Sequence, residues 1–292
     1  MLTVTERIKT MTKKSGTYIE TIGELPVVSL REFEGSPKSF TLEELDYEMD
    51  LHASDYETVS PSVIGPAVEG LFKMAMGQDV SVAFRASYFG AILLDNIGKL
   101  GEKHDEFIVG HHTSQVRDLM DQLGATLGKG KPYEAKHGID LCTYDVVYRT
   151  GNPAYYRPYS RLTLETEENV YRMVDYAKEV FKELHEGDTI KEVAFDEESF
   201  GRYITKGDGD FMTDQTLWDM KVWTKSFDKK VYIQLLCYYL LGMNGRTTRS
   251  HYENLEYIGV INPRLQESHR LRIADIPQAD LDLVREKVIG MN

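Results

Sequence analysis

Two aspartates and a lysine in the last third of the chain are the residues best suited to chemistry. Asp210 follows the turn-like Gly207-Asp208-Gly209, and Asp219 and Lys221 lie two residues apart in an apolar run. If that run is a strand, period-2 alternation points both of its side chains to the same face. Two carboxylates, with the Met220 carbonyl, are hard oxygen ligands of the kind that Mg²⁺ or Mn²⁺ takes. The spacing therefore predicts a metal site beside an ammonium, which would orient an attacking water and offset charge on phosphorus.

A glutamine and a tyrosine are predicted to lie on a neighbouring helix. Gln234 and Tyr238 are four residues apart in the range 229–241, which is apolar on nearly every face. On a helix that spacing places both side chains on one face. A buried amide without a partner costs about 1–3 kcal/mol. We therefore expect Gln234 to hydrogen-bond within the site that holds Asp219.

The three patterns occur in an order that resembles a known family. Gly-x-x-Asp210, Asp219-x-Lys221 and Gln234-x-x-x-Tyr238, on strand, strand and helix, resemble the RecB-like (QxxxY) branch of the PD-(D/E)XK nucleases. The run 207–276 is similar to a group of uncharacterised bacterial proteins of similar length. The resemblance implies a nuclease that hydrolyses phosphodiester bonds with Mg²⁺ or Mn²⁺. It favours DNA as substrate, exonuclease over endonuclease action, and a role in bacterial or mobile-element DNA processing or defence.

The same family usually places one more acidic residue on a helix before the core strands. The first candidate here is Glu69, on a helix expected at 63–76 after the start signal Ser60-Pro61-Ser62. Glu168 is the second candidate. A solvent-facing carboxylate is the alternative for either residue, so Glu69 is a tentative third metal ligand. The family's second acidic position is often Glu, and this chain has Asp219 there.

Periodicity predicts an α/β protein whose first half is largely helical. The resemblance narrows this to a PD-(D/E)XK (restriction-endonuclease-like) core, a mixed sheet flanked by helices with a large helical insertion. Residues 1–58 would form a polar extension, and 59–292 one nuclease-like domain with a helical region 78–186 and a catalytic core 187–292. The expected helices are 63–76, 78–99, 113–127, one capped by Thr166 that ends near Gly187, 229–241 and 277–289, with a short one from Leu42. The expected strands are 26–30, 189–195, 201–212, 216–223, 257–262 and 270–274.

Composition sets the broad class. The 292 residues carry a net charge of −13 and two cysteines, Cys142 and Cys237. Two cysteines are too few for a disulfide framework, a four-cysteine zinc site or an iron–sulfur cluster, so both should be buried thiols. No apolar run is long enough to span a membrane, and we expect a cytoplasmic protein. The acidic balance opposes a passive nucleic-acid coat, although residues 221–250 hold six bases against one acid.

Several alternatives remain open at this point. The aspartates could be turn and cap residues, and the fold a non-catalytic module that binds nucleic acid or a protein partner. The absence of an ATPase motif leaves room for a partner or a homo-oligomer. His111-His112 is expected to be a surface or capping pair, and Asp145 with Arg149 a structural ion pair. Tyr155-Tyr156 could stack on bases, with packing of an irregular connector as the alternative.

Overall fold

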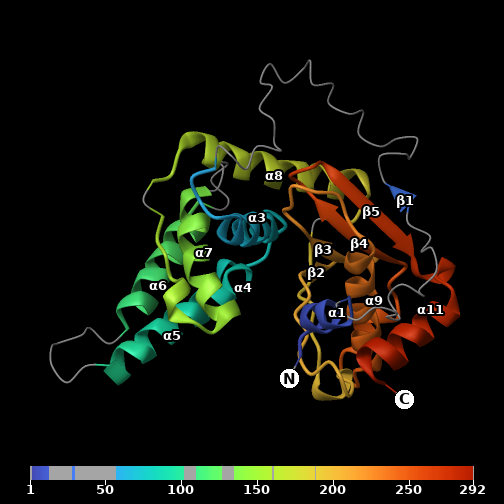
Figure 1. The fold of residues 1–292 in the computed structure, drawn as a ribbon. Helices are drawn as coiled ribbons and strands as arrows, with labels where there is room; N and C mark the ends of the chain where they lie inside the picture. The colour runs from blue at the N-terminus through green and yellow to red at the C-terminus, as the bar shows by residue number, and fades with distance from the viewer. Residues whose placement is uncertain are drawn as a thin grey trace. The chain divides into compact units, whose positions relative to one another are not determined.

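The computed structural model describes residues 2–12, 28–29, 57–101, 110–126, 135–159, 161–187 and 189–291 (Figure 1). Its contacts group the chain into two compact units. One, the sheet unit, comprises Met1–Glu48 with Val180–Asn292, and the other, the helical unit, is Met49–Glu179. From the sequence we expected boundaries at residues 58 and 186. The predicted helix 63–76 falls in the helical unit, and the core strands fall in the sheet unit. The helix expected from Leu42 lies outside the described residues.

The helical unit contains long helices joined by short connectors. They are α3 (Pro61–Ala75), α4 (Val80–Ala83), α5 (Arg85–Gly101), α6 (His111–Gly124), α7 (Ala135–Thr150), a 3₁₀ turn (Pro153–Tyr155) and most of α8 (Leu164–Glu183). Ser60 accepts a hydrogen bond from the Ser62 amide and so caps α3, as its sequence predicted. The helices α5 and α7 touch through their backbones, because a Cβ at Gly90 would lie 1.9 Å from the Tyr144 carbonyl oxygen. Only glycine allows that approach.

The start of α8 corrects one prediction. Thr166 was expected to cap this helix, but α8 begins at Leu164, two residues earlier. Thr163 precedes the helix, and its hydroxyl accepts a hydrogen bond from the Thr166 amide at 3.4 Å. Thr166 is itself buried, and its hydroxyl accepts a hydrogen bond from the Thr58 amide at 3.2 Å. Two threonines three residues apart offered the same cap signal, and burial of the second decided between them.

The sheet unit is built on a five-stranded mixed sheet in the order β1-β5-β4-β3-β2. The strands are β1 (Val28–Ser29), β2 (Phe211–Met212), β3 (Thr216–Met220), β4 (Tyr257–Asn262) and β5 (Glu267–Arg272). Among the strands that the structure describes, β3 and β4 form the one parallel pair, and α9 (Lys229–Asn244) makes the crossover between them. Flanking elements are α1 (Val4–Thr12), α10 (Arg249–Tyr252), α11 (Gln278–Leu283) and a π-helix (Val284–Ile289). The protein is therefore of the α/β class, with a mixed sheet flanked by helices.

The strand β3, which lies between β4 and β2 in the sheet, is buried along its whole length. Alternation sends Leu217 into the apolar core that it shares with α9, and Trp218 to the other face, where its ring lies 4.9 Å from that of Phe181 at the end of α8. Asp219 follows Leu217 onto the α9 face. This strand therefore directs one buried carboxylate toward α9, a helix whose buried residues are mostly apolar.

Two predicted strands are absent or much shorter among the described residues. The range 189–195 makes only a single bridge, between Lys191 and Met212. The range 201–212 contributes the two residues of β2 and a single bridge between Lys206 and Thr3. The ladder with β3 ends there because a side chain, Asp210, accepts the Met220 amide in place of the backbone. Gly209 also packs against Val193, where a Cβ would lie 2.5 Å from a methyl carbon, so this segment follows a tight irregular path.

Two expectations from composition can be compared with the structure. Cys142 and Cys237 are both buried free thiols, which confirms the prediction, and burial raises the pKa of each thiol. Within the described ranges, no helix has the length and apolar character needed to cross a bilayer.

Candidate metal and catalytic site

The site centres on Asp219 in the middle of the sheet unit. Its side chain is 1% exposed, and Lys221 Nζ lies 2.6 Å from its Oδ2. Lys221 follows the last residue of β3 and remains attached to the sheet, because its amide donates to the Ile261 carbonyl at 2.8 Å. The two side chains thus lie on the same side of the extended chain, as their spacing predicted. An ammonium ion-paired with a buried carboxylate is held far more firmly than one on the surface.

Asp210 is fixed next to this pair by the backbone. Its Oδ2 accepts the Met220 amide at 2.6 Å, a charge-assisted bond. Met220 lies between Asp219 and Lys221, so the bond brings the two aspartates to the same end of the β2–β3 hairpin. The close packing of Gly209 on Val193 holds the chain just before Asp210.

Gln234 and Tyr238 reach the same place from α9. The Gln234 amide nitrogen lies 2.8 Å from the Tyr238 hydroxyl and 3.5 Å from Asp219 Oδ1. Burial raises the pKa of Tyr238 well above its usual value, and the nearby charges of Asp219 and then Asp210 raise it further. The phenol is therefore neutral at any physiological pH and keeps its proton as a donor. All five residues predicted from the motifs meet in one place.

The charges of the site suit a divalent cation. The carboxylates of Asp210 and Asp219 meet at the end of β3, and their oxygens are hard ligands of the kind that a divalent cation takes. Across the described ranges, no group of three or more His, Cys, Asp or Glu side chains converges in a way that could hold a metal ion. Magnesium needs no such group, because it keeps several waters and binds through one or two carboxylates. Asp210 and Asp219 fit that mode of binding.

The two candidate upstream acids lie in the helical unit. Glu69 is on α3, where its Oε1 lies 2.5 Å from Lys73 Nζ, one helical turn away. Glu168 is exposed on the first turns of α8. The structure therefore gives Glu69 a cationic partner of its own, and its assignment as a third metal ligand stays a prediction.

A tryptophan beside Lys221 was missed by the sequence reasoning. Trp223 is partly buried, and its ring centroid lies 5.9 Å from Lys221 Nζ and 5.3 Å from Lys225 Nζ. The fully buried Asn262 at the end of β4 fixes it, because its side chain accepts the Trp223 amide at 3.3 Å and donates to the Trp223 carbonyl at 3.0 Å. An asparagine closing an apolar strand was the available signal, since a buried amide must find partners.

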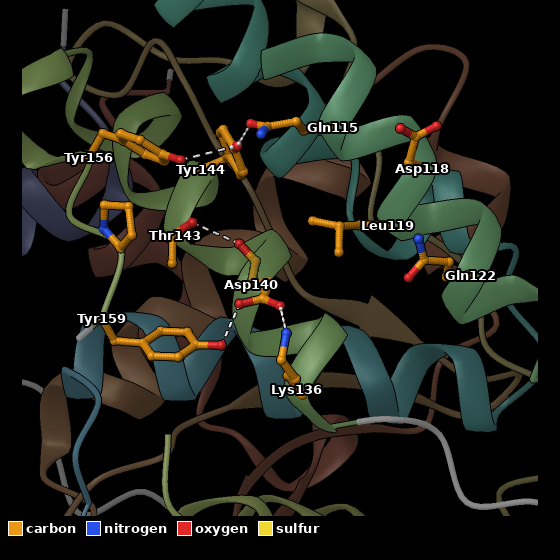
Figure 2. Close-up of a pocket in the computed structure, with 11 residues that line it drawn as sticks. Gln115, Asp118, Leu119, Gln122, Lys136, Asp140, Thr143, Tyr144, Tyr156 and Tyr159 are labelled. Atoms are coloured by element: carbon orange, nitrogen blue, oxygen red, sulfur yellow. Dashed lines mark hydrogen bonds and ion pairs between the residues drawn. The ribbon is translucent and has the colours of Figure 1, made fainter. Parts of the chain in front are cut away.

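The helical unit holds a separate feature, a pocket of about 540 Å³ (Figure 2). Its walls contain none of the five motif residues. Tyr156 lines it and packs on Tyr144, whereas Tyr155 is 53% exposed. The predicted ion pair between Asp145 and Arg149 is confirmed, at 2.5 Å.

Comparison of the chain with protein-family models, with curated proteins and with solved structures found no match.

Proposed function

We propose that this protein is a metal-dependent nuclease of the PD-(D/E)XK type, most closely of its RecB-like branch. The observation that carries the proposal is the convergence on Asp219. This buried carboxylate contacts Lys221 from its own strand and Gln234 from the crossover helix. A turn or cap residue would have no reason to be buried in an interior strand with both groups aimed at it.

The order of elements supports the same assignment. The carboxylate of Asp210 precedes β2, the Asp-x-Lys pattern occupies the end of β3, and the Gln-x-x-x-Tyr pattern lies on α9. This is the strand, strand and helix setting in which the motifs resemble the family. A parallel strand, β4, then follows the helix and closes the unit beside β3.

Each side chain has a distinct part in the proposed reaction. Asp210 and Asp219 would hold Mg²⁺ or Mn²⁺, which supplies Lewis acidity toward the phosphodiester and lowers the pKa of water. Lys221 orients the attacking water and offsets charge that develops on the phosphate oxygens. Gln234 sets the direction of the Asp219 carboxylate, and the neutral Tyr238 hydroxyl fixes the Gln234 amide in turn.

The proposed substrate is nucleic acid, with DNA favoured and exonuclease action expected over endonuclease action. The segment after the site supplies positive charge for a phosphate backbone, because Lys225 and Lys230 are both exposed. The chain as a whole is acidic, so binding to DNA is expected to be local to this surface. A protein partner or a homo-oligomer would supply any further hold on the strand.

The test is cleavage of defined substrates by the purified full chain. Labelled linear DNA, circular DNA and RNA are incubated in Mg²⁺, in Mn²⁺ and in EDTA. Cleavage of linear DNA in either metal and none in EDTA is the expected result. Cleavage of circular DNA would correct the exonuclease assignment alone. No cleavage of any substrate, together with no change in thermal unfolding on adding either metal, would leave a non-catalytic nucleic-acid-binding or partner-binding module as the better account.

A further inference from the structure

The pocket in the helical unit has three walls of different chemistry (Figure 2). One wall is a single face of α6, whose residues recur at the spacing of helical turns. These residues are Gln115, Asp118, Leu119 and Gln122. The second wall is the Lys136–Tyr144 face of α7, and the third is the connector with Tyr156 and Tyr159. A volume of about 540 Å³ is in the range of pockets that hold a small molecule or one part of a larger ligand.

The partly exposed Tyr156 gives the pocket a flat and rigid surface, and the buried Tyr144 ring packs behind it. The Tyr144 and Tyr156 rings lie 4.9 Å apart, and the edge of His112 supports both, at 5.8 and 5.2 Å. Their hydroxyls form a chain, with Tyr156 donating to Tyr144 at 3.1 Å and Tyr144 donating to Gln115 at 2.9 Å. Burial raises the pKa of Tyr144, so the chain stays protonated. The Tyr156 ring, held in this way, loses little entropy when a flat ligand stacks on its exposed face.

The polar groups of the pocket differ in whether they have a partner among the described residues. Asp140 is occupied, since it pairs with Lys136 at 2.7 Å and accepts the Tyr159 hydroxyl. In contrast, the Asp118 carboxylate and the Gln122 amide are exposed to solvent and make no hydrogen bond or ion pair with any residue that the structure describes. They lie one helical turn apart on the α6 face and line the pocket. A ligand would therefore meet an acceptor pair on Asp118 next to an amide that both donates and accepts.

We propose that this pocket binds an unpaired nucleobase of the nucleic-acid strand, with guanine preferred. A base has a flat face that stacks on tyrosine, and such stacking tolerates any sequence. Its exposed pairing edge mixes donors and acceptors, as the wall of α6 does. Guanine alone presents two adjacent N–H donors on that edge, which match the two oxygens of a carboxylate. A simple ammonium ligand would use Asp118 but leave the donors of the two glutamines unused.

The inference rests on the proposed nuclease function only in naming the strand that supplies the base. It implies that the preferred substrate has single-stranded character, because a base must leave its stack and its partner to enter a pocket. Its test is made in EDTA, where the proposed cleavage is off.

The test is binding of short fluorescent oligothymidylates by the full chain, measured by anisotropy. The strands carry one central dG, dA or dC, and the variants are Tyr156→Ala and Tyr156→Phe. Tyr156→Ala should weaken binding of the dG strand by roughly tenfold, the loss of one stacked base, whereas Tyr156→Phe keeps the ring and should bind within about twofold of the unaltered chain. Tyr155→Ala is the matched control, since this exposed neighbour does not line the pocket. Equal losses in Tyr155→Ala and Tyr156→Ala would overturn the proposal.

The acidic wall has its own test and its own control. Asp118→Asn should remove the preference for dG over dA, expected at roughly tenfold in the unaltered chain. Asp121→Asn, on α6 but outside the pocket, should keep it. No preference for dG in the unaltered chain, or choline displacing the dG strand as readily as GMP does, would overturn the assignment. If the unaltered chain cleaves DNA with metal but does not bind the base, the pocket alone is refuted. If it binds the base but does not cleave, the pocket is supported and the nuclease is refuted.

Discussion

Replacing Lys221 by methionine measures how much its ammonium stabilises the buried Asp219 carboxylate. The Asp219 carboxylate is 1% exposed, and the substitution removes the ammonium 2.6 Å from it. Breaking a buried ion pair from one side costs about 3–5 kcal/mol, because a charge stays behind in a poorly solvated place. Lys221 is 15% exposed, so solvent reduces that cost, and the Gln234 amide at 3.5 Å continues to face the carboxylate. We expect Lys221→Met to lower the free energy of unfolding by about 2–4 kcal/mol.

The assay is urea unfolding in EDTA, followed by tryptophan fluorescence. Both tryptophans of the chain, Trp218 and Trp223, belong to the sheet unit, so the signal reports on the unit that holds the site. The double variant Asp219→Asn/Lys221→Met should recover at least half of the loss, because it removes the charge as well as its partner. Mg²⁺ should restabilise Lys221→Met and leave the double variant unchanged. Losses that simply add in the double variant would refute the reasoning.

Three further predictions concern neighbouring groups. Asn262→Ala should lower the free energy of unfolding by about 1–3 kcal/mol in the same urea assay, because it leaves the Trp223 backbone amide and carbonyl without their partner; an unchanged midpoint would contradict this. Tyr238→Phe should slow cleavage about tenfold without changing the shape of the pH–rate profile up to pH about 10, since burial keeps that phenol protonated; a limb lost in the variant would show that Tyr238 titrates. The Asp196 carboxylate accepts the Thr247 amide, which lowers its pKa from 3.8 to about 2. This pKa is lower in the folded than in the unfolded chain, so its stabilisation is present above pH 3.8 and is lost as the pH falls through about 2. Thermal unfolding across that interval should therefore change less in Asp196→Asn than in the unaltered chain, and equal slopes would be the contrary result.

The elements that carry the motifs were predictable because their signals were local. The range 216–223 contains β3, the range 229–241 lies within α9, and 257–262 is β4 with the same bounds. Continuous apolar runs with a capping Asp228 or a turn on each side leave few alternatives to a buried helix or strand. The contact between Asp219 and Lys221 follows from period-2 spacing alone.

The segment before β2 could not be predicted, because its path is set by contacts distant in sequence. Residues 201–210 were expected to belong to a strand, yet Asp210 bonds to the Met220 amide and Gly209 packs on Val193. The same holds for Trp223, whose place depends on a side chain at position 262. A single sequence shows which polar residues lie in apolar runs and must find hydrogen-bond partners, but it does not show which residues those partners are.

The division into units was also beyond the sequence signals. Nothing in the composition marks residue 179, where one unit ends within α8. The pocket depends on the same long-range packing, since its walls come from α6, α7 and the connector after α7. The Tyr155-Tyr156 pair was visible in the sequence, but only the structure separates the exposed ring from the one that lines the pocket.

The central claim is that Asp219 belongs to a working hydrolytic site, and one paired comparison tests it most directly. Cleavage of a labelled linear DNA in Mg²⁺ is followed under single-turnover conditions for Asp219→Asn and for Asp214→Asn. Asp214 is the matched control, because it lies on the turn between β2 and β3 and is 82% exposed. Asp219→Asn should lose a factor of about 10³ or more in rate, while Asp214→Asn should keep the rate of the unaltered chain. Equal rates in the two folded variants would contradict the claim.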